Sequence, residues 1–147
     1  MSRRVAISLS AVSAVAIAAP AFAAPNAAPT SLNIRAGKAV VKAHSHDTFT
    51  ATLTSKGKPV AAQTVNLQER IAPTTGHKTT WSDVKGTGGT PVTATTDAKG
   101  HAVFTGITPP IASHKSTQKD QYRAVYTKTA TYGGSHSSAV TVTVKRS

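Results

Sequence analysis

The 147-residue sequence contains no cysteine, and this absence excludes several classes of site. Disulfides, on which many small exported domains depend, cannot form. Thiolate metal sites and thiol nucleophiles are excluded for the same reason. The fold must instead be stabilised by its hydrophobic core, which is feasible because a chain of this size buries roughly two-thirds of its unfolded surface.

Acidic residues are scarce, with 5 Asp and Glu against 17 Lys and Arg and a formal net charge of +12. General acid–base catalysis needs paired carboxylates or a carboxylate with a histidine. The available carboxylates are those of Asp47, Glu69, Asp83, Asp97 and Asp120, and no Gly-x-Ser-x-Gly nucleophile motif occurs. We therefore expect a protein that is not an enzyme and that needs no cofactor.

A long hydrophobic run is missing after the first 23 residues, and that first segment has the form of a signal peptide. Arg3 and Arg4 precede an uncharged apolar stretch, residues 5–19, and Ala21-Phe22-Ala23 supplies a small-x-small cleavage site. The stretch is shorter than the about 20 residues that a membrane helix needs. We predict cleavage after Ala23, export by the general secretory rather than the twin-arginine route, and a secreted product that is at most loosely bound to the cell wall.

Helical periodicity is also missing, whereas Thr and Val are abundant. We interpret residues 24–30 as a short Ala/Pro-rich linker and residues 31–147 as one domain. Residues 48–54 alternate Phe49, Ala51 and Leu53 with threonines, the pattern of a half-buried strand. Similar segments are expected at 31–35, 39–42, 64–71, 79–84, 121–128 and 138–145. This spacing predicts an all-β sandwich of about seven to nine antiparallel strands, with an up-and-down barrel as the alternative.

A tight β-hairpin is predicted at residues 92–105, around the sequence Asp97-Ala98-Lys99-Gly100. Aspartate at the first position of a turn accepts hydrogen bonds from nearby backbone N–H groups, and glycine at the fourth position adopts positive φ without steric cost. The β-branched residues on both sides are typical of the two arms of a hairpin.

Six motifs, taken together and in order, resemble those of bacterial immunoglobulin-like (Big-type) domains of exported and surface proteins in high-GC Gram-positive bacteria. The motifs are Gly57-x-Pro59-Val60-Ala61, Thr64-Val65-x-Leu67-x-x-Arg70, Trp81-x-x-Val84, Thr96-Asp97-x-x-Gly100-x-Ala102-x-Phe104, Tyr122-Arg123-Ala124-x-Tyr126 and Ser138-Ala139-Val140-x-Val142-x-Val144. The resemblance covers residues 31–146 and implies an immunoglobulin-like β-sandwich, with Ala124 where a disulfide partner would stand. It implies no catalytic residues, because the family shares none, and its members often serve as spacers or adhesive units.

If the strands follow immunoglobulin order, four histidines gather in the loops at one end of the sandwich: His44, His46, His77 and His114. Neutral imidazole nitrogen is a good ligand for zinc or copper, so these are the candidate metal ligands. Histidine is also tolerated in exposed loops, and His44-Ser45-His46 lacks the spacing that fixes a site. We expect no resident metal, and a weak pH dependence because exposed imidazoles become charged below about pH 6.5.

The opposite end would gather four lysines, which are the candidate polyanion-binding residues: Lys56, Lys58, Lys99 and Lys128. Outside a cell, such charge meets anionic wall polymers and acidic polysaccharides. Specific nucleic-acid binding is not expected, because the few aromatic residues are interpreted as core and stacking would need them exposed. We expect a secreted, non-enzymatic module, without a transmembrane span, with a binding or structural role at the cell envelope. It binds envelope polymers loosely or contacts another extracellular protein, and the alternative for its charge is that it only aids solubility or passive retention by the wall. The alternative is a secreted protease inhibitor that presents residues 106–119, the longest irregular segment.

Overall fold

The computed structural model describes residues 26–72 and 80–147, so the predicted signal peptide lies outside the described residues. The strands are β1 (Ser31–Ala36), β2 (Val40–Lys42), β3 (Asp47–Ser55), β4 (Lys58–Pro59), β5 (Thr64–Arg70), β6 (Ser82–Asp83), β7 (Thr93–Thr95), β8 (His101–Ile107), β9 (Thr117–Tyr126), β10 (Ser135–His136) and β11 (Val140–Lys145), and a 3-10 helix η1 spans Thr87–Gly89. Within these ranges no helix has the length and apolar character needed to cross a membrane.

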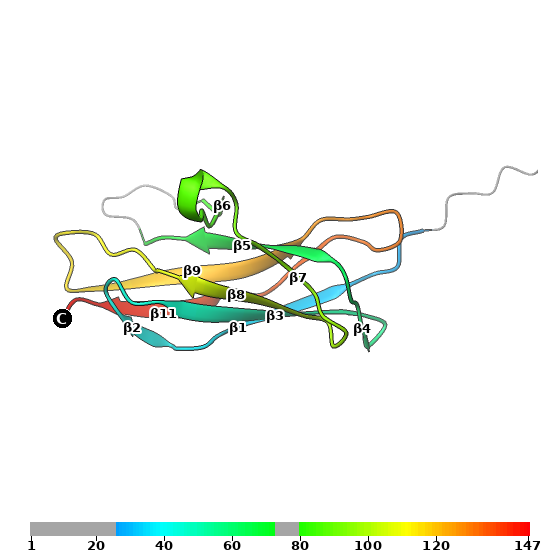
Figure 1. Ribbon diagram of the computed structural model, residues 1–147, viewed down its shortest axis with the longest axis horizontal. Coiled ribbons are helices and arrows are strands. Elements are labelled where there is room, and N and C mark those ends of the chain that lie inside the picture. The colour runs from blue at the N-terminus through cyan, green and yellow to red at the C-terminus, as the bar shows by residue number, and fades with distance from the viewer. Residues whose placement is uncertain (1–25, 73–79) are drawn as a thin grey trace, which may run out of the picture.

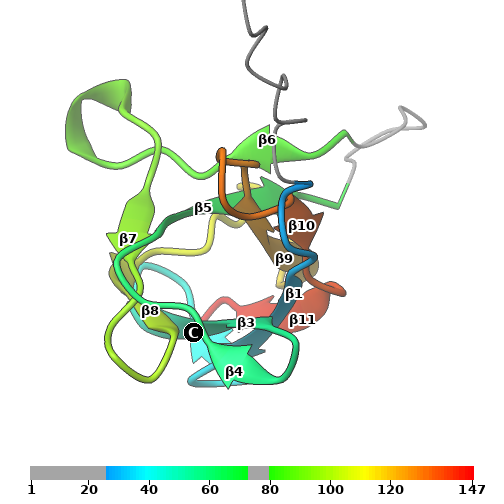
Figure 2. The same cartoon turned by 90° about the vertical axis from the view of Figure 1, so that its right-hand side faces the viewer.

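Two sheets pack face to face and enclose the core (Figures 1 and 2). In the four-stranded sheet, β3 has β1 on one side and both β4 and β8 on the other. The seven-stranded sheet runs β2-β11-β9-β5-β6, with β10 paired to β9 and β7 paired to β5. Two packed sheets of this kind form an all-β sandwich, so the predicted fold class is confirmed. The expectation of purely antiparallel pairing needs one correction, because β2 and β11 are parallel.

The core lies between the sheets where the alternation of the sequence predicted it. Phe49, Ala51 and Leu53 on β3 are fully buried, and the threonines between them face outward. The Phe49 and Tyr122 rings meet across the core with centroids 4.5 Å apart. The facing sheet adds Val65, Leu67, Ala124, Tyr126, Val142 and Val144, all buried. Each large apolar side chain buried in this way contributes roughly 1.5–3 kcal/mol to stability.

The turn at residues 97–100 forms as predicted, but the predicted hairpin is wrong beyond it. The Asp97 carboxylate Oδ1 accepts hydrogen bonds from the N–H groups of Lys99 at 2.8 Å and His101 at 2.9 Å, and Gly100 has φ +77°. The two arms do not pair with each other, because β7 pairs with β5 and β8 pairs with the nine-residue β3. The chain therefore crosses from one sheet to the other at this turn.

Part of the predicted linker is bound to the domain. The Ala28 N–H donates to the Thr131 carbonyl at 2.8 Å, and the Gly133 N–H donates to the Ala28 carbonyl at the same distance. The Ser55 hydroxyl donates to the Pro29 carbonyl at 2.8 Å. These bonds attach residues 28 and 29 to the loop between β9 and β10 and to the end of β3.

Candidate functional site

The loop between β2 and β3 and the loop 108–116 lie at the same end of the sandwich, as expected for the histidines (Figure 1). His44 and His114 are exposed, and His46 Nδ1 forms a 2.9 Å hydrogen bond with the Thr108 hydroxyl. His77 lies outside the described residues. Across 26–72 and 80–147 no three His, Cys, Asp or Glu side chains are grouped so that they could hold a metal ion.

The four candidate lysines are all exposed and lie at the other end of the sandwich (Figure 1). Lys56 and Lys58 flank the turn between β3 and β4, and Lys99 lies in the neighbouring 97–100 turn, which is joined to β3 by the 2.9 Å bond from the Leu53 N–H to the Gly100 carbonyl. Lys128 follows β9 and lies beside Tyr126 and Gln63 instead. An ammonium on a flexible stem at a loop tip is not fixed in position, so this end supplies charge but little geometry.

The loop proposed for protease inhibition is shorter than predicted, since residues 106–107 belong to β8 and residues 117–119 to β9. Residues 108–116 are fixed from inside by Gln118, whose amide nitrogen donates to the Pro110 carbonyl at 3.0 Å and whose oxygen accepts the Ala112 N–H at 3.1 Å. Arg146 Nη2 donates to the Ala112 carbonyl at 3.0 Å. The loop is thus supported without a disulfide, although these bonds occupy backbone groups of its own.

Several of the few carboxylates lie inside the sandwich rather than on its surface. Asp120 is fully buried and accepts hydrogen bonds from Gln118 Nε2 at 2.9 and 3.0 Å and from the Ala72 N–H at 3.2 Å. Burial raises the pKa of Asp120 despite these bonds. The pKa of the nearby Tyr122 phenol is raised mainly by burial and further by the surrounding carboxylates, of which Glu69 contributes most. The interior at this end of the sandwich is therefore acidic, in contrast to the surface.

The outer face of the seven-stranded sheet holds the arrangement that the sequence analysis missed. Because Gln118, Asp120 and Tyr122 face inward, Lys119 and Arg123 of β9 face outward. The cross-strand register places Lys42 of β2 beside Lys145 of β11, Lys119 beside Thr143, Arg70 beside Gln121, and Arg123 beside Gln68. We call the five cations Lys42, Arg70, Lys119, Arg123 and Lys145, together with Trp81, the cationic face.

Trp81 lies against two guanidinium groups of this face, although the aromatic residues were expected in the core. The Cζ atom of Arg123 is 4.4 Å from the centroid of the Trp81 ring, and that of Arg70 is 4.9 Å from it. A cation at such a distance from a tryptophan ring is stabilised by about 0.5–1 kcal/mol at an exposed site. The half-buried indole therefore acts as a platform that positions both positive charges.

Neutral amides fix the two guanidinium groups without neutralising them. Arg123 Nε and Nη2 donate to the Gln68 side-chain oxygen at 2.9 and 2.8 Å, and Arg70 donates to the Gln121 side-chain oxygen in the same way. The Gln68 amide nitrogen in turn donates to Asp83 Oδ1 at 3.0 Å. Nη1 of each arginine has no hydrogen-bond partner among the described residues, so donors remain for a phosphate or carboxylate ligand.

One pattern in the sequence, the alternation along the strands, predicts part of the cationic face. The alternation along residues 64–70 and 117–126 already separates inward from outward positions, and the outward cations Arg70, Lys119 and Arg123 follow from it. No signal identifies Trp81 as their partner, because it lies outside both segments.

No family model matches the sequence, and a search of the curated proteins finds no match either. The function of the chain must therefore be inferred from the geometry of its surfaces.

Proposed function

We propose that this protein is an exported, non-enzymatic immunoglobulin-like module that binds anionic polymers of the cell envelope through the cationic face. The observation that carries this proposal is the pair of guanidinium groups held on Trp81 by neutral glutamine partners. The signal-peptide pattern supports an extracellular partner, and the 17 − 2 = 15 basic against 5 acidic residues that remain after cleavage (net charge +10) support an anionic one. The resemblance to Big-type domains supports a binding or structural role rather than catalysis.

The face suits a polymer better than the loop lysines do, because a sheet fixes the distances between charges. Neighbouring strands lie about 4.8 Å apart, and alternate residues of one strand lie about 6.8 Å apart. Charges on such a grid can meet successive anionic groups of an extended chain at the same time. The arginine side chains are already oriented before binding, which reduces the entropy lost when the ligand binds.

Co-sedimentation with purified Gram-positive cell wall tests the proposal, with walls stripped of anionic polymer as the background. The double variant Arg70→Gln/Arg123→Gln removes two charges from the cationic face, and Lys56→Gln/Lys99→Gln removes two charges from the loops. We expect the first variant to bind at least about 10-fold more weakly than wild type and the second to bind within about 2-fold, since only fixed, preoriented charges contribute strongly. Equal losses in both variants would show that binding depends on net charge rather than on this face.

The salt dependence provides an independent measurement on the same samples. The screening length falls from about 30 Å at 0.01 M to about 3 Å at 1 M ionic strength, so purely electrostatic retention disappears across this range. Retention by wild type that persists at high salt and is lost in Arg70→Gln/Arg123→Gln would support contacts specific to the cationic face.

Protease inhibition is the second candidate, and the support that Gln118 and Arg146 give to residues 108–116 favours it. An inhibitory loop must be rigid and must resist cleavage. Inhibition assays with a panel of serine and cysteine proteases test this candidate directly. Rapid cleavage within residues 108–116 at low enzyme concentration would exclude it.

A further inference from the structure

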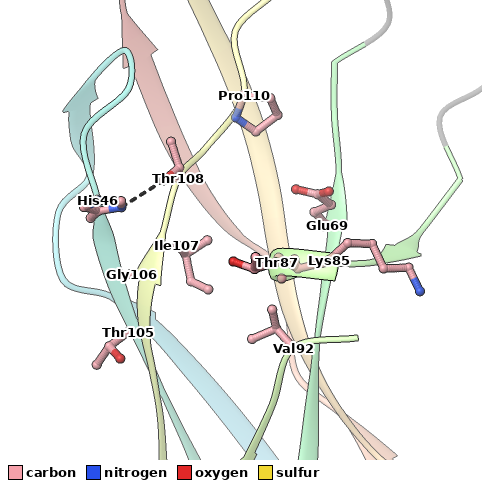
Figure 3. A pocket seen from close by; sticks show the side chains of 12 residues that line it. His46, Glu69, Lys85, Thr87, Val92, Thr105, Gly106, Ile107, Thr108 and Pro110 are labelled. Atoms are coloured by element: carbon pink, nitrogen blue, oxygen red, sulfur yellow. Dashed lines mark hydrogen bonds between the residues drawn. The ribbon is translucent and has the colours of Figure 1, made fainter. Parts of the chain in front are cut away.

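A pocket of about 520 Å³ opens between the two sheets, at the end of the sandwich that carries His46 (Figure 3). It lies where β7 and β8 diverge into different sheets, and its walls come from β5, from β8 with the segment that follows it, and from the segment between β6 and β7. The volume falls within the range of about 300–1,000 Å³ that is typical of small-molecule sites. None of the residues that line it belongs to the cationic face.

Glu69 is the acidic residue of this pocket. The alternation along β5 buries Val65 and Leu67 and places Glu69 on the same inward side, opposite to Arg70. In Figure 3 its carboxylate extends from β5 toward the side of the opening where Ile107 and Thr108 lie. The carboxylate has no hydrogen-bond partner in the part of the chain that the structure describes. The carboxylate is open to the pocket, so its hydrogen-bond donors come from solvent or from a bound ligand.

The other residues that line the pocket determine which kind of hydrogen-bond donor can reach Glu69. Val84, Val92 and Ile107 are apolar, and Thr87 and Thr108 add hydroxyl groups. The one lysine of the lining, Lys85, extends away from the opening, so its ammonium does not neutralise Glu69 (Figure 3). His46 closes one side through its bond to the Thr108 hydroxyl. The lining thus combines a few aliphatic side chains with hydroxyl groups, the His46 imidazole and a single carboxylate.

We infer that this pocket binds a primary ammonium group carried on a short aliphatic chain. The ammonium donates a charge-assisted hydrogen bond to the Glu69 carboxylate in place of water, and the alkyl chain packs on the valine and isoleucine side chains. A lysine side chain of a peptide and a free alkylamine or polyamine share this chemistry. The anionic polymers proposed for the cationic face are excluded here, because they would meet the Glu69 carboxylate.

Titration with n-pentylamine, followed by the amide shifts in heteronuclear NMR spectra, tests this inference. At neutral pH we expect binding with a Kd of about 1 mM, with shifts around Glu69, Val92 and Ile107. 1-Pentanol and pentanoate are the matched ligands without positive charge, and we expect them to bind at least about 10-fold more weakly. N-acetyl-lysine amide and cadaverine then distinguish a peptide side chain from a free polyamine as the preferred source of the amine.

The variant Glu69→Gln keeps the shape of the side chain and removes its charge, and Asp83→Asn is the matched control on the outer side of the sheet. We expect Glu69→Gln to weaken pentylamine binding at least about 10-fold, Asp83→Asn to leave it within about 2-fold, and Glu69→Asp to retain part of it. Equal binding of pentylamine and pentanol, unchanged affinity in Glu69→Gln, or no shifts in wild type would overturn the inference. Wall binding by Glu69→Gln remains at the wild-type level if the cationic face acts independently, so the two proposals can fail separately.

Discussion

The two outer faces of this sandwich are built on the same alternation and yet differ in character. On the four-stranded sheet, the outward positions of β3 are all threonines. Those of β1 and β8 are mostly uncharged, with Arg35 as the one arginine. On the seven-stranded sheet, the outward positions carry the cationic face. We call the outer surface of the four-stranded sheet the threonine face. Because the inward residues of both sheets form one common core, the outward residues are freer to vary, and they give each face its own chemistry.

The comparison also shows how charge is fixed. Arg35 is exposed on β1 beside Thr50, and it makes no hydrogen bond to another side chain among the described residues. Arg123 has Gln68 and Trp81 as neighbours, both of which hold its guanidinium group in place. Two outward-facing arginines therefore differ in the side chains that contact them, and we expect Arg123 to be the more rigid of the two.

The largest effect is expected at the turn that connects the two faces. A Cβ atom on Gly100 would lie 2.4 Å from the Leu53 carbonyl oxygen, and its φ is +77°. We expect Gly100→Ala to lower the free energy of unfolding by about 3 kcal/mol, measured by urea denaturation. Gly57→Ala is the control, since φ is +75° there but no atom lies within 4 Å, and it should cost only about 1–2 kcal/mol. Equal losses would mean that the Leu53 backbone yields to the new methyl group.

Moving three positive charges from the cationic face to the threonine face tests whether wall binding depends on where the charges lie or only on their number. The variant Arg70→Gln/Lys119→Gln/Arg123→Gln is combined with three lysines at the exposed outward positions Ser31, Asn33 and Val103, which restores the net charge. We expect wall binding to remain at least about 10-fold weaker than wild type, because the threonine face lacks the fixing partners. Recovery of binding would show that net charge is sufficient.

Replacing Trp81 tests how much the indole ring contributes to the cationic face. We expect a smaller loss of polymer affinity than from removing the arginines. Trp81→Leu keeps an apolar side chain but loses the attraction to the guanidinium groups, which is about 0.5–1 kcal/mol. We expect a 2- to 5-fold loss of polymer affinity, roughly the equivalent of that energy. Since the chain has a single tryptophan, its fluorescence should change as anionic polymer is added to wild type and should change less in Arg70→Gln/Arg123→Gln. Fluorescence that does not respond during saturation would place the ligand elsewhere.

The smallest effect concerns the acidic interior between the faces. Burial, followed by the charge of Asp120, raises the pKa of Glu69 above its ordinary value of 4.5. The fold therefore prefers the protonated carboxyl, and wild type loses stability as the pH rises from 4.5 through this raised pKa. We expect Glu69→Gln to match wild type at pH 4 and to exceed it by up to about 1 kcal/mol at pH 7.5 in urea denaturation, since partial exposure limits the effect. A stability difference that is equal at both pH values would contradict this assignment.

The inward residues of the fold were predictable because strand alternation is a local property. Phe49, Ala51 and Leu53 are buried as the sequence indicates, and the same holds for Val142 and Val144. Strand partners are not local, so the pattern around Asp97 predicted the turn but not that its arms enter different sheets. Strands of two residues, such as β6, are too short to show an alternation of apolar and polar residues, so the sequence does not predict them.

The candidate site was less predictable than the fold, for a related reason. Loop residues were selected because loops often carry function. The cationic face instead combines strand positions from β2, β5, β9 and β11, and its geometry depends on a register that joins residues far apart in the chain, such as Arg70 and Gln121. Trp81, which contacts Arg123, lies 42 positions before it in the chain, and only the folded structure brings the two together.

The parallel pairing of β2 with β11 has a mechanical consequence. β2 is the second strand of the domain and β11 is the last. A force that pulls β2 toward the N-terminus of the chain and β11 toward its C-terminus draws the two parallel strands in opposite directions along their lengths. The backbone bonds from the Thr143 N–H to the Ala39 carbonyl, 2.9 Å, and from the Ala43 N–H to the Lys145 carbonyl, 2.8 Å, lie across this direction. They are loaded together in shear instead of being opened one after another, so we expect this strand pair to resist such a force.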